Sequence, residues 1–146
     1  MEAAAILIVL AIALTKKGAE SSVIVANGAT VSRIAEAIAF AEGFHVAGSR
    51  PRRNNNPGNL TLDIAGGGRT VGRDGAYVVY ATAADGWEDL KAQVRMMLAN
   101  KSRFYNRDMR LIDVARIYTA TEQDAWARNV AFKLGVRSET KLSEIH

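Results

Sequence analysis

The chain has 146 residues, 49% of them hydrophobic, with 19 Lys and Arg against 15 Asp and Glu. This length and composition predict one domain with a hydrophobic core and argue against an intrinsically disordered protein. The lack of cysteine excludes a disulfide scaffold, a thiolate metal site and a thiol nucleophile, and two histidines are too few for a typical histidine-rich metal site. We therefore expect neither a metal nor another cofactor.

The net charge of +4 would suit an anionic partner such as nucleic acid, anionic lipid or a cell-wall polymer, although it is also common among ordinary domains. The cations gather at Arg50, Arg52 and Arg53 and again between Lys101 and Arg110. Neither cluster alternates with aromatic residues in the manner of a single-strand stacking platform. We expect no nucleic-acid partner.

Residues Ala3 to Leu14 are all apolar and are followed by Lys16 and Lys17. As a helix this run would be about 18 Å long, shorter than the roughly 30 Å hydrocarbon core of a bilayer. Three interpretations stay open for residues 1–17: a membrane anchor, an export signal, or a hydrophobic helix buried in an assembly. The lysines favour a cytoplasmic position for the chain that follows an anchor. Residues 18–29 are predicted to be a linker and residues 30–146 a folded domain.

A helix is predicted from Thr30, a plausible N-cap, to the neighbourhood of Gly43, a typical C-terminal stop. Its apolar positions recur at spacings of three and four: Val31, Ile34, Ile38 and Ala41. Glu42 is expected in the last turn, where the negative end of the helix dipole disfavours ionisation of its carboxyl group.

Two short strands are predicted next, over residues 59–64 and 76–81, with turns at residues 66–69 and 73–75. The glycine triplet before Arg69 does not match a phosphate-binding loop, because no Gly-Lys-Ser/Thr follows it and a strand comes next. A flexible hairpin is the interpretation we adopt.

The remaining segments have helical periodicity. One helix is predicted to open with a capping box at Asp85–Glu88, a shorter one to follow, and a third to be capped by Thr121 and to stop at Gly135. Their predicted inward positions are Trp87, Leu90, Val94 and Met97; Leu111, Val114, Ala115 and Tyr118; and Trp126, Val130 and Leu134. Both tryptophans are expected to be core residues. The fold class is therefore α+β and mostly helical.

Glu42 is the candidate catalytic residue. Cleavage of a glycosidic bond requires a proton for the leaving oxygen, and a carboxyl group supplies it near neutral pH only where its surroundings keep it protonated. The helix end and the apolar neighbours Phe40, Ala41 and Phe44 both act in that direction. An asparagine-rich turn, residues 54–59, follows twelve residues later, and its amides could meet sugar hydroxyl and acetamido groups.

The run from Ile34 to Phe44 and the block Gly48–Leu60, with Asn-Asn-Asn-Pro-Gly-Asn at its end, resemble phage and bacterial lysozyme-like domains, which belong with the lytic transglycosylases and goose-type lysozymes. Weaker likenesses are the segments Tyr80–Trp87 and Ala131–Val136. The resemblance covers roughly residues 31–145.

The resemblance implies a lysozyme-like catalytic domain with a cleft beside a small β-hairpin, acting on peptidoglycan between N-acetylmuramic acid and N-acetylglucosamine. It assigns Glu42 as the single catalytic acid and places Asn55, Asn56 and Asn59 on the loop that lines the cleft. Tyr118 falls where such domains often hold an aromatic ring against the sugar, and it could equally be a core residue.

Two chemistries stay open. An inverting hydrolase needs a second carboxylate to position water, and the candidates are Asp63 and Asp85; a lytic transglycosylase needs Glu42 alone. We favour the latter. The expected setting is the membrane, a virion or the host cell envelope, with peptidoglycan strands and virion proteins as partners. The alternative is a non-catalytic, membrane-associated virion component that binds glycan or coat proteins.

Overall fold

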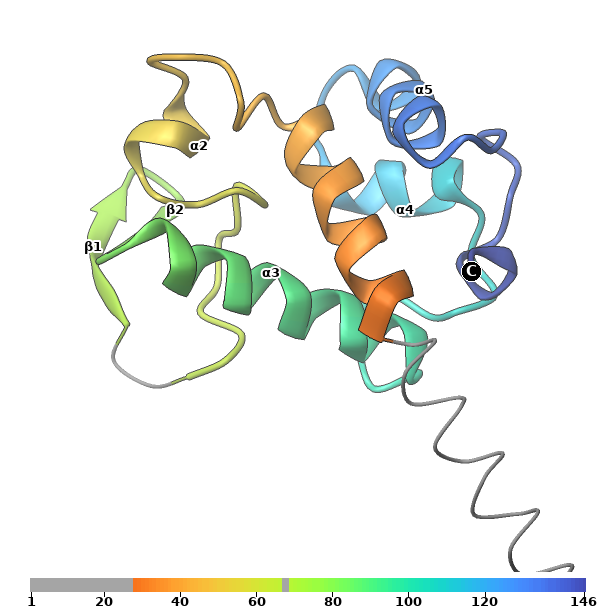
Figure 1. The fold of residues 1–146 in the computed structure, drawn as a ribbon, viewed down its shortest axis with the longest axis horizontal. Coiled ribbons are helices and arrows are strands. Elements are labelled where there is room, and N and C mark those ends of the chain that lie inside the picture. Colours follow the sequence, from red (N-terminus) through yellow and green to blue (C-terminus); the bar gives the residue numbers. More distant parts are fainter. Residues whose placement is uncertain (1–27, 67–68) are drawn as a thin grey trace, which may run out of the picture. The chain divides into compact units, whose positions relative to one another are not determined.

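The first element in the computed structural model, which describes residues 28–66 and 69–146, is a helix whose described part covers residues 28–41 (Figure 1). Thr30 lies inside this helix, so the prediction that it caps the N-terminus is wrong. The predicted end is confirmed, because Gly43 adopts a left-handed backbone conformation with φ of 79°. The buried face of the helix includes Val31, Ile34, Ala35 and Ile38.

The hydrophobic N-terminal segment predicted over residues 1–17 lies outside the described residues, as does most of the linker predicted over residues 18–29. Residues Val31–Ile145 form one compact unit, and the elements that follow all belong to it. No helix within residues 28–66 and 69–146 is long and apolar enough to cross a membrane.

A four-residue helix, α2 (Arg50–Arg53), comes next and was not predicted. Ser49 caps it by accepting a hydrogen bond from the backbone N–H of Arg52, and Pro51, in its first turn, is buried. These local preferences are visible in the sequence, although a single turn is too short to give a helical period.

The strand predicted over residues 59–64 is absent from the structure. Leu60 makes one backbone hydrogen bond to β2, in which its carbonyl accepts from the N–H of Val78 at 2.9 Å. Two N–H groups of the segment are bonded to side chains: that of Leu60 donates to Asn56 Oδ1 at 2.8 Å, and that of Ile64 donates to Asp89 Oδ2 at 3.0 Å. Buried side-chain acceptors have thus replaced a β-ladder here.

The β-hairpin consists of β1 (Thr70–Asp74) and β2 (Tyr77–Tyr80), which pair antiparallel. Gly75, with φ of 61°, lies in the connecting turn. The prediction of a strand over residues 76–81 is therefore confirmed, whereas its partner is β1 and not residues 59–64.

Three longer helices complete the unit: α3 (Ala83–Leu98), α4 (Leu111–Tyr118) and α5 (Gln123–Leu134), followed by a short 3-10 helix, η1 (Leu142–Glu144). The cap of α3 is Thr82, whose Oγ1 accepts from the N–H of Asp85, so this helix begins three residues earlier than predicted. The predicted Thr121 cap of α5 is also wrong, because Glu122 holds that position. Gly135 ends α5 as predicted, with φ of 71°.

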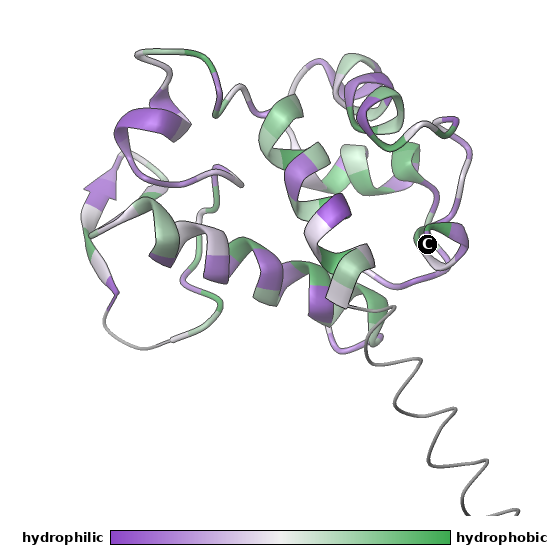
Figure 2. Cartoon of the chain, in the orientation of Figure 1, coloured by the Kyte–Doolittle hydropathy of each residue, from purple (hydrophilic) through white to green (hydrophobic). Residues whose placement is uncertain are grey.

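The predicted inward residues of these helices belong to the core, and all but Trp87 and Tyr118 are buried. Hydrophilic and hydrophobic residues alternate along the ribbons of α3 and α5 in Figure 2, as expected for helices with one buried face. Trp126 is buried, while Trp87 is partly buried and packs edge-on against Phe44 with ring centroids 5.5 Å apart. The described residues thus form an α+β structure, mainly helical, with a two-stranded antiparallel hairpin.

Candidate active site

Glu42 follows directly on the last helical residue and is partly buried. Its backbone N–H still donates to the carbonyl of Ile38 at 2.9 Å, which fixes the main chain. Its side chain is held by α5, because the indole Nε1–H of Trp126 donates to Glu42 Oε1 at 2.8 Å. Glu42 is therefore held both at its backbone and at its carboxyl group.

The pKa of Glu42 is raised above its ordinary value, and burial is the largest cause. Hydrogen bonds from the side chains of Trp126 and Asn59 act in the opposite direction, since they stabilise the carboxylate. Desolvation outweighs both. The side chain thus holds its proton to a higher pH than an exposed glutamate does.

Three aromatic side chains gather beside this carboxyl group. Tyr118 stacks on Trp126 with ring centroids 4.9 Å apart and lies 6.3 Å from Tyr105. Burial raises the pKa of Tyr105 to about 12, with a further contribution from the charge of Glu42. The same two causes, in the same order, raise the pKa of Tyr118. Both phenols are therefore neutral hydrogen-bonding groups across the physiological range.

Tyr118 also fixes the asparagine-rich loop. Its hydroxyl donates to the carbonyl of Gly58 at 2.6 Å. The side chain is partly buried against the core and also lines a pocket, and its contact with a sugar stays a prediction.

The asparagines of the loop divide into two groups. Asn56 is completely buried, and its amide donates to the carbonyls of Leu60 and Val78, both at 2.9 Å. Its Oδ1 accepts from the backbone of Leu60. The prediction that Asn56 contacts substrate is therefore wrong for this conformation: its hydrogen-bonding groups join the loop to β2.

Asn55 is partly exposed and also bonded to the hairpin. It adopts a left-handed backbone conformation with φ of 52°, and its amide donates to the carbonyl of Tyr80 at 3.1 Å. It remains partly exposed, so one edge stays accessible while the other ties the loop to the hairpin.

Asn59 is the asparagine that faces the carboxyl group. It also has a left-handed backbone conformation, with φ of 48°, and its amide hydrogen-bonds to Glu42. Its Oδ1 is buried with no hydrogen-bond partner in the described residues. A buried acceptor without a partner is costly and rare in folded proteins, so this oxygen is a candidate to accept a hydrogen bond from a ligand.

Close contacts set the position of the loop on α3. A Cβ atom added at Gly86 would lie 1.9 Å from the carbonyl oxygen of Asn55, and one added at Gly58 would lie 2.7 Å from a methyl carbon of Leu90. Only glycine fits at either place. These close contacts fix the position of the loop relative to α3 and to Tyr118.

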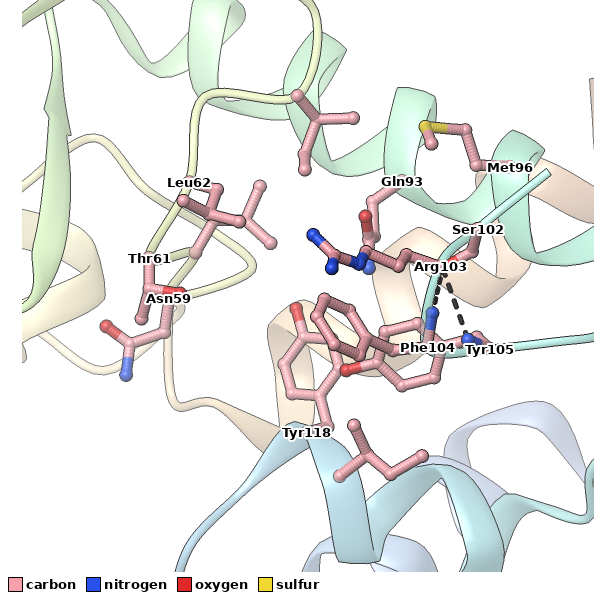
Figure 3. Close-up of a pocket in the computed structure, with 13 residues that line it drawn as sticks. Asn59, Thr61, Leu62, Gln93, Met96, Ser102, Arg103, Phe104, Tyr105 and Tyr118 are labelled. Carbon is pink, nitrogen blue, oxygen red and sulfur yellow. Dashed lines mark hydrogen bonds between the residues drawn. The ribbon is translucent and has the colours of Figure 1, made fainter.

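An open pocket of about 490 Å³ lies next to Asn59, Tyr105 and Tyr118 (Figure 3). Asn59, Tyr105 and Tyr118 belong both to its lining and to the surroundings of Glu42. The lining also includes Leu62, Arg103 and Phe104. Glu42 itself is not among the residues that line the pocket, so the candidate acid is connected to it through the first three of these side chains.

The two candidate second carboxylates have other local roles. Asp63 is exposed and accepts from the N–H of Gly66 at 2.9 Å. The carboxylate of Asp85 accepts a hydrogen bond from the hydroxyl of Thr82 at 2.8 Å and lies 3.7 Å from the guanidinium of Arg69. Within the described residues, no carboxylate contributes to the pKa shift of Glu42.

Sequence reasoning missed Trp126 and Tyr105 as members of the site. The signal available for Trp126 was chemical: a buried indole N–H needs an acceptor, and an amphipathic pattern gives only the burial. Tyr105 carried no such signal, because it lies outside any predicted helix or strand.

The immediate surroundings of Glu42 are thus amides and aromatic rings. Residues 28–66 and 69–146 contain no group of three or more His, Asp or Glu placed to hold a metal ion. Comparisons of the chain with models of protein families, with curated proteins and with solved structures found no match. Function is accordingly inferred from the geometry of Glu42 and its neighbours.

Proposed function

We propose that this chain is a peptidoglycan-cleaving glycosidase with a lysozyme-like fold, in which Glu42 is the general acid and base. The observation that carries the proposal is a partly buried carboxyl group of raised pKa next to side chains that line an open pocket, Asn59, Tyr105 and Tyr118. The bond cleaved is that between N-acetylmuramic acid and N-acetylglucosamine.

Protonated Glu42 gives its proton to the glycosidic oxygen as the bond to the muramyl anomeric carbon breaks. The muramyl ring then carries the positive charge of an oxocarbenium ion, and Glu42 is an ionised carboxylate. The hydrogen bonds from Trp126 and Asn59 stabilise that carboxylate, so they favour the proton transfer as it occurs.

The second half of the reaction needs a nucleophile. In a lytic transglycosylase the muramyl 6-hydroxyl attacks its own anomeric carbon, and Glu42 takes the hydroxyl proton back, which restores the acid and leaves a 1,6-anhydro ring. A hydrolase would instead need a carboxylate to position water. Because Asp63 and Asp85 are engaged elsewhere, we favour the transglycosylase.

The cleft offers groups of the kind that bind amino sugars. Two of them line the pocket: Tyr118 with a partly buried ring, and Asn59, whose buried amide oxygen has no hydrogen-bond partner among the described residues. Asn55 has a partly exposed amide but does not line the pocket. Amides match acetamido groups, and rings pack against the apolar faces of sugars.

The location remains a proposal from the sequence. The apolar run Ala3–Leu14 supports association with a membrane, in a virion or in the host envelope. Virion proteins are then candidate neighbours of the chain.

Glu42→Gln tests the assignment, because glutamine keeps the size and the hydrogen-bond acceptor but cannot give a proton. We expect the rate of solubilisation of purified peptidoglycan to fall roughly 10²–10⁴-fold, the usual contribution of general acid catalysis. Glu88→Gln is the matched control, since Glu88 is an exposed glutamate on α3, and it should retain full activity. Full activity of Glu42→Gln would overturn the proposal.

A further inference from the structure

The lining of the pocket beside Glu42 has a composition that a neutral sugar does not require. The described side chains that line the pocket include one cation, Arg103, and no carboxylate. They also include Leu62, Phe104 and Ile117, which are 56%, 56% and 46% exposed. Large apolar side chains gathered around a single cation favour a ligand that is itself anionic and partly apolar.

The backbone of this region is fixed while two of its side chains project. Ser102 Oγ accepts from the N–H groups of Phe104 and Tyr105, both at 3.2 Å, and Tyr105 is buried in the core. Figure 3 shows Arg103 extending from this segment across the pocket toward Leu62 and Thr61. The guanidinium therefore projects into the cleft from a rigid base.

No carboxylate in the described residues pairs with Arg103. Its guanidinium lies 5.9 Å from the centre of the Phe104 ring, within reach of a cation–π interaction. An arginine without an acidic neighbour retains its full capacity for a ligand carboxylate, which it binds with two parallel hydrogen bonds.

We propose that Arg103, with Phe104 beside it, binds the acidic substituent on the muramyl sugar, so that the enzyme selects anionic glycan. This inference rests on the proposed function. The substituent is a lactyl group that ends either in its own carboxylate or in a peptide stem with carboxylates. The two sources share one chemistry, a carboxylate on a short apolar arm.

The test uses two glycans, each in two forms. One is purified peptidoglycan with its peptide stems, and the other is the same glycan after amidase treatment, which leaves the lactyl carboxylate free. Each is compared with a sample whose carboxylates have been converted to neutral methylamides. The measured quantity is the rate of cleavage of the native form divided by the rate for its methylamide.

We expect this ratio to be about ten for the unaltered protein on at least one glycan, the scale of one charge-assisted hydrogen bond at a partly exposed site. Arg103→Gln should bring the ratio close to one, and Arg103→Glu should invert it. Arg107→Glu is the matched control, because Arg107 is an exposed arginine of the same segment outside the pocket lining, and it should keep the original ratio.

The pattern across the glycans identifies the group that is bound. A preference only on the amidase-treated glycan indicates the lactyl carboxylate, one only on the intact material indicates the stem, and one on both indicates either carboxylate. A ratio of one for the unaltered protein, or an unchanged ratio in Arg103→Glu, would overturn this inference and leave the proposed function intact. Failure of the unaltered protein to cleave any of the four samples would instead contradict the proposed function.

Discussion

The carboxyl group of Glu42 is subject to two opposite influences. Burial favours its protonated form, while the indole N–H of Trp126 and the amide of Asn59 favour the carboxylate. A general acid needs both, because it must hold a proton at the start and be stable without it after transfer. Trp126 is in this account a positioning residue that orients Glu42 and limits the rise of its pKa.

Trp126→Phe should therefore raise the pKa of Glu42 further, because it removes a hydrogen bond to the carboxylate and keeps an aromatic ring against Tyr118. Since the protonated form is the active acid, the alkaline limb of the profile of kcat/KM against pH should move to higher pH. Trp87→Phe is the control, because Trp87 packs on Phe44, and it should leave the limb in place. A limb that moves to lower pH in Trp126→Phe would contradict the assigned role.

At the scale of elements, the geometry of the site depends on the position of the loop, residues 54–59, between β2 and α3. Asn55 and Asn56 bond the loop to β2, and the contacts at Gly58 and Gly86 press it against α3 and Tyr118. Asn59 is presented to Glu42 as a result. Most of the asparagine-rich motif thus serves to place one asparagine.

Gly86→Ala tests this seating. In a helix interior alanine is favoured over glycine by up to about 1 kcal/mol, so a helix that packed loosely here would be stabilised. Because the new methyl group would collide with the carbonyl of Asn55, we expect a loss of roughly 2–3 kcal/mol in the free energy of unfolding. Urea denaturation measures it, and Gly72→Ala, whose Cβ would meet nothing within 4 Å, is the control. A stabilised Gly86→Ala would refute the close contact.

Elements with a clear period were predictable, and those held by specific contacts were not. Leu90, Val94 and Met97 gave the buried face of α3 from spacing alone. Residues 59–64 were predicted to be a strand, but the N–H of Leu60 bonds to the side chain of Asn56, in the preceding turn, and the N–H of Ile64 to that of Asp89, 25 residues away. Propensity carries no information about such partners.

The site followed the same division. Glu42 could be predicted from its place at a helix end and from the turn that follows it. The different roles of Asn56 and Asn59 could not be predicted, because asparagines of one loop look alike in sequence. Only the folded backbone shows that Asn56 is buried with its side chain fully hydrogen-bonded, whereas Asn59 faces the carboxyl group. The role of Trp126 could not be predicted either, because its hydrogen bond to Glu42 joins two residues that are 84 positions apart in the chain.

For the molecule as a whole, the raised pKa of Glu42 links the site to the stability of the fold. The stability that this residue contributes is fully present below the pKa of about 4.3 that it has in the unfolded chain, and it is lost as pH rises through the higher value in the fold. Above that value the folded protein holds a partly buried charge.

Glu42→Gln should consequently have a higher Tm than the unaltered protein at pH 7, and the difference should shrink to nothing toward about pH 4, where both states of the unaltered chain are protonated. Calorimetry across this range measures the difference. Glu88→Gln, at an exposed position, should show no such pH dependence. A Glu42→Gln protein that is less stable at pH 7 would show that the carboxylate is stabilised by its surroundings.

The central claim is that Glu42 alone carries out glycan cleavage, and mass spectrometry of digested peptidoglycan tests it most directly. We expect the unaltered protein to release fragments with 1,6-anhydromuramyl ends and Glu42→Gln to release none above background. New reducing ends in place of anhydro ends would contradict the single-carboxylate mechanism. Equal fragment release by both proteins, or none by the unaltered protein, would contradict the assignment of Glu42 itself.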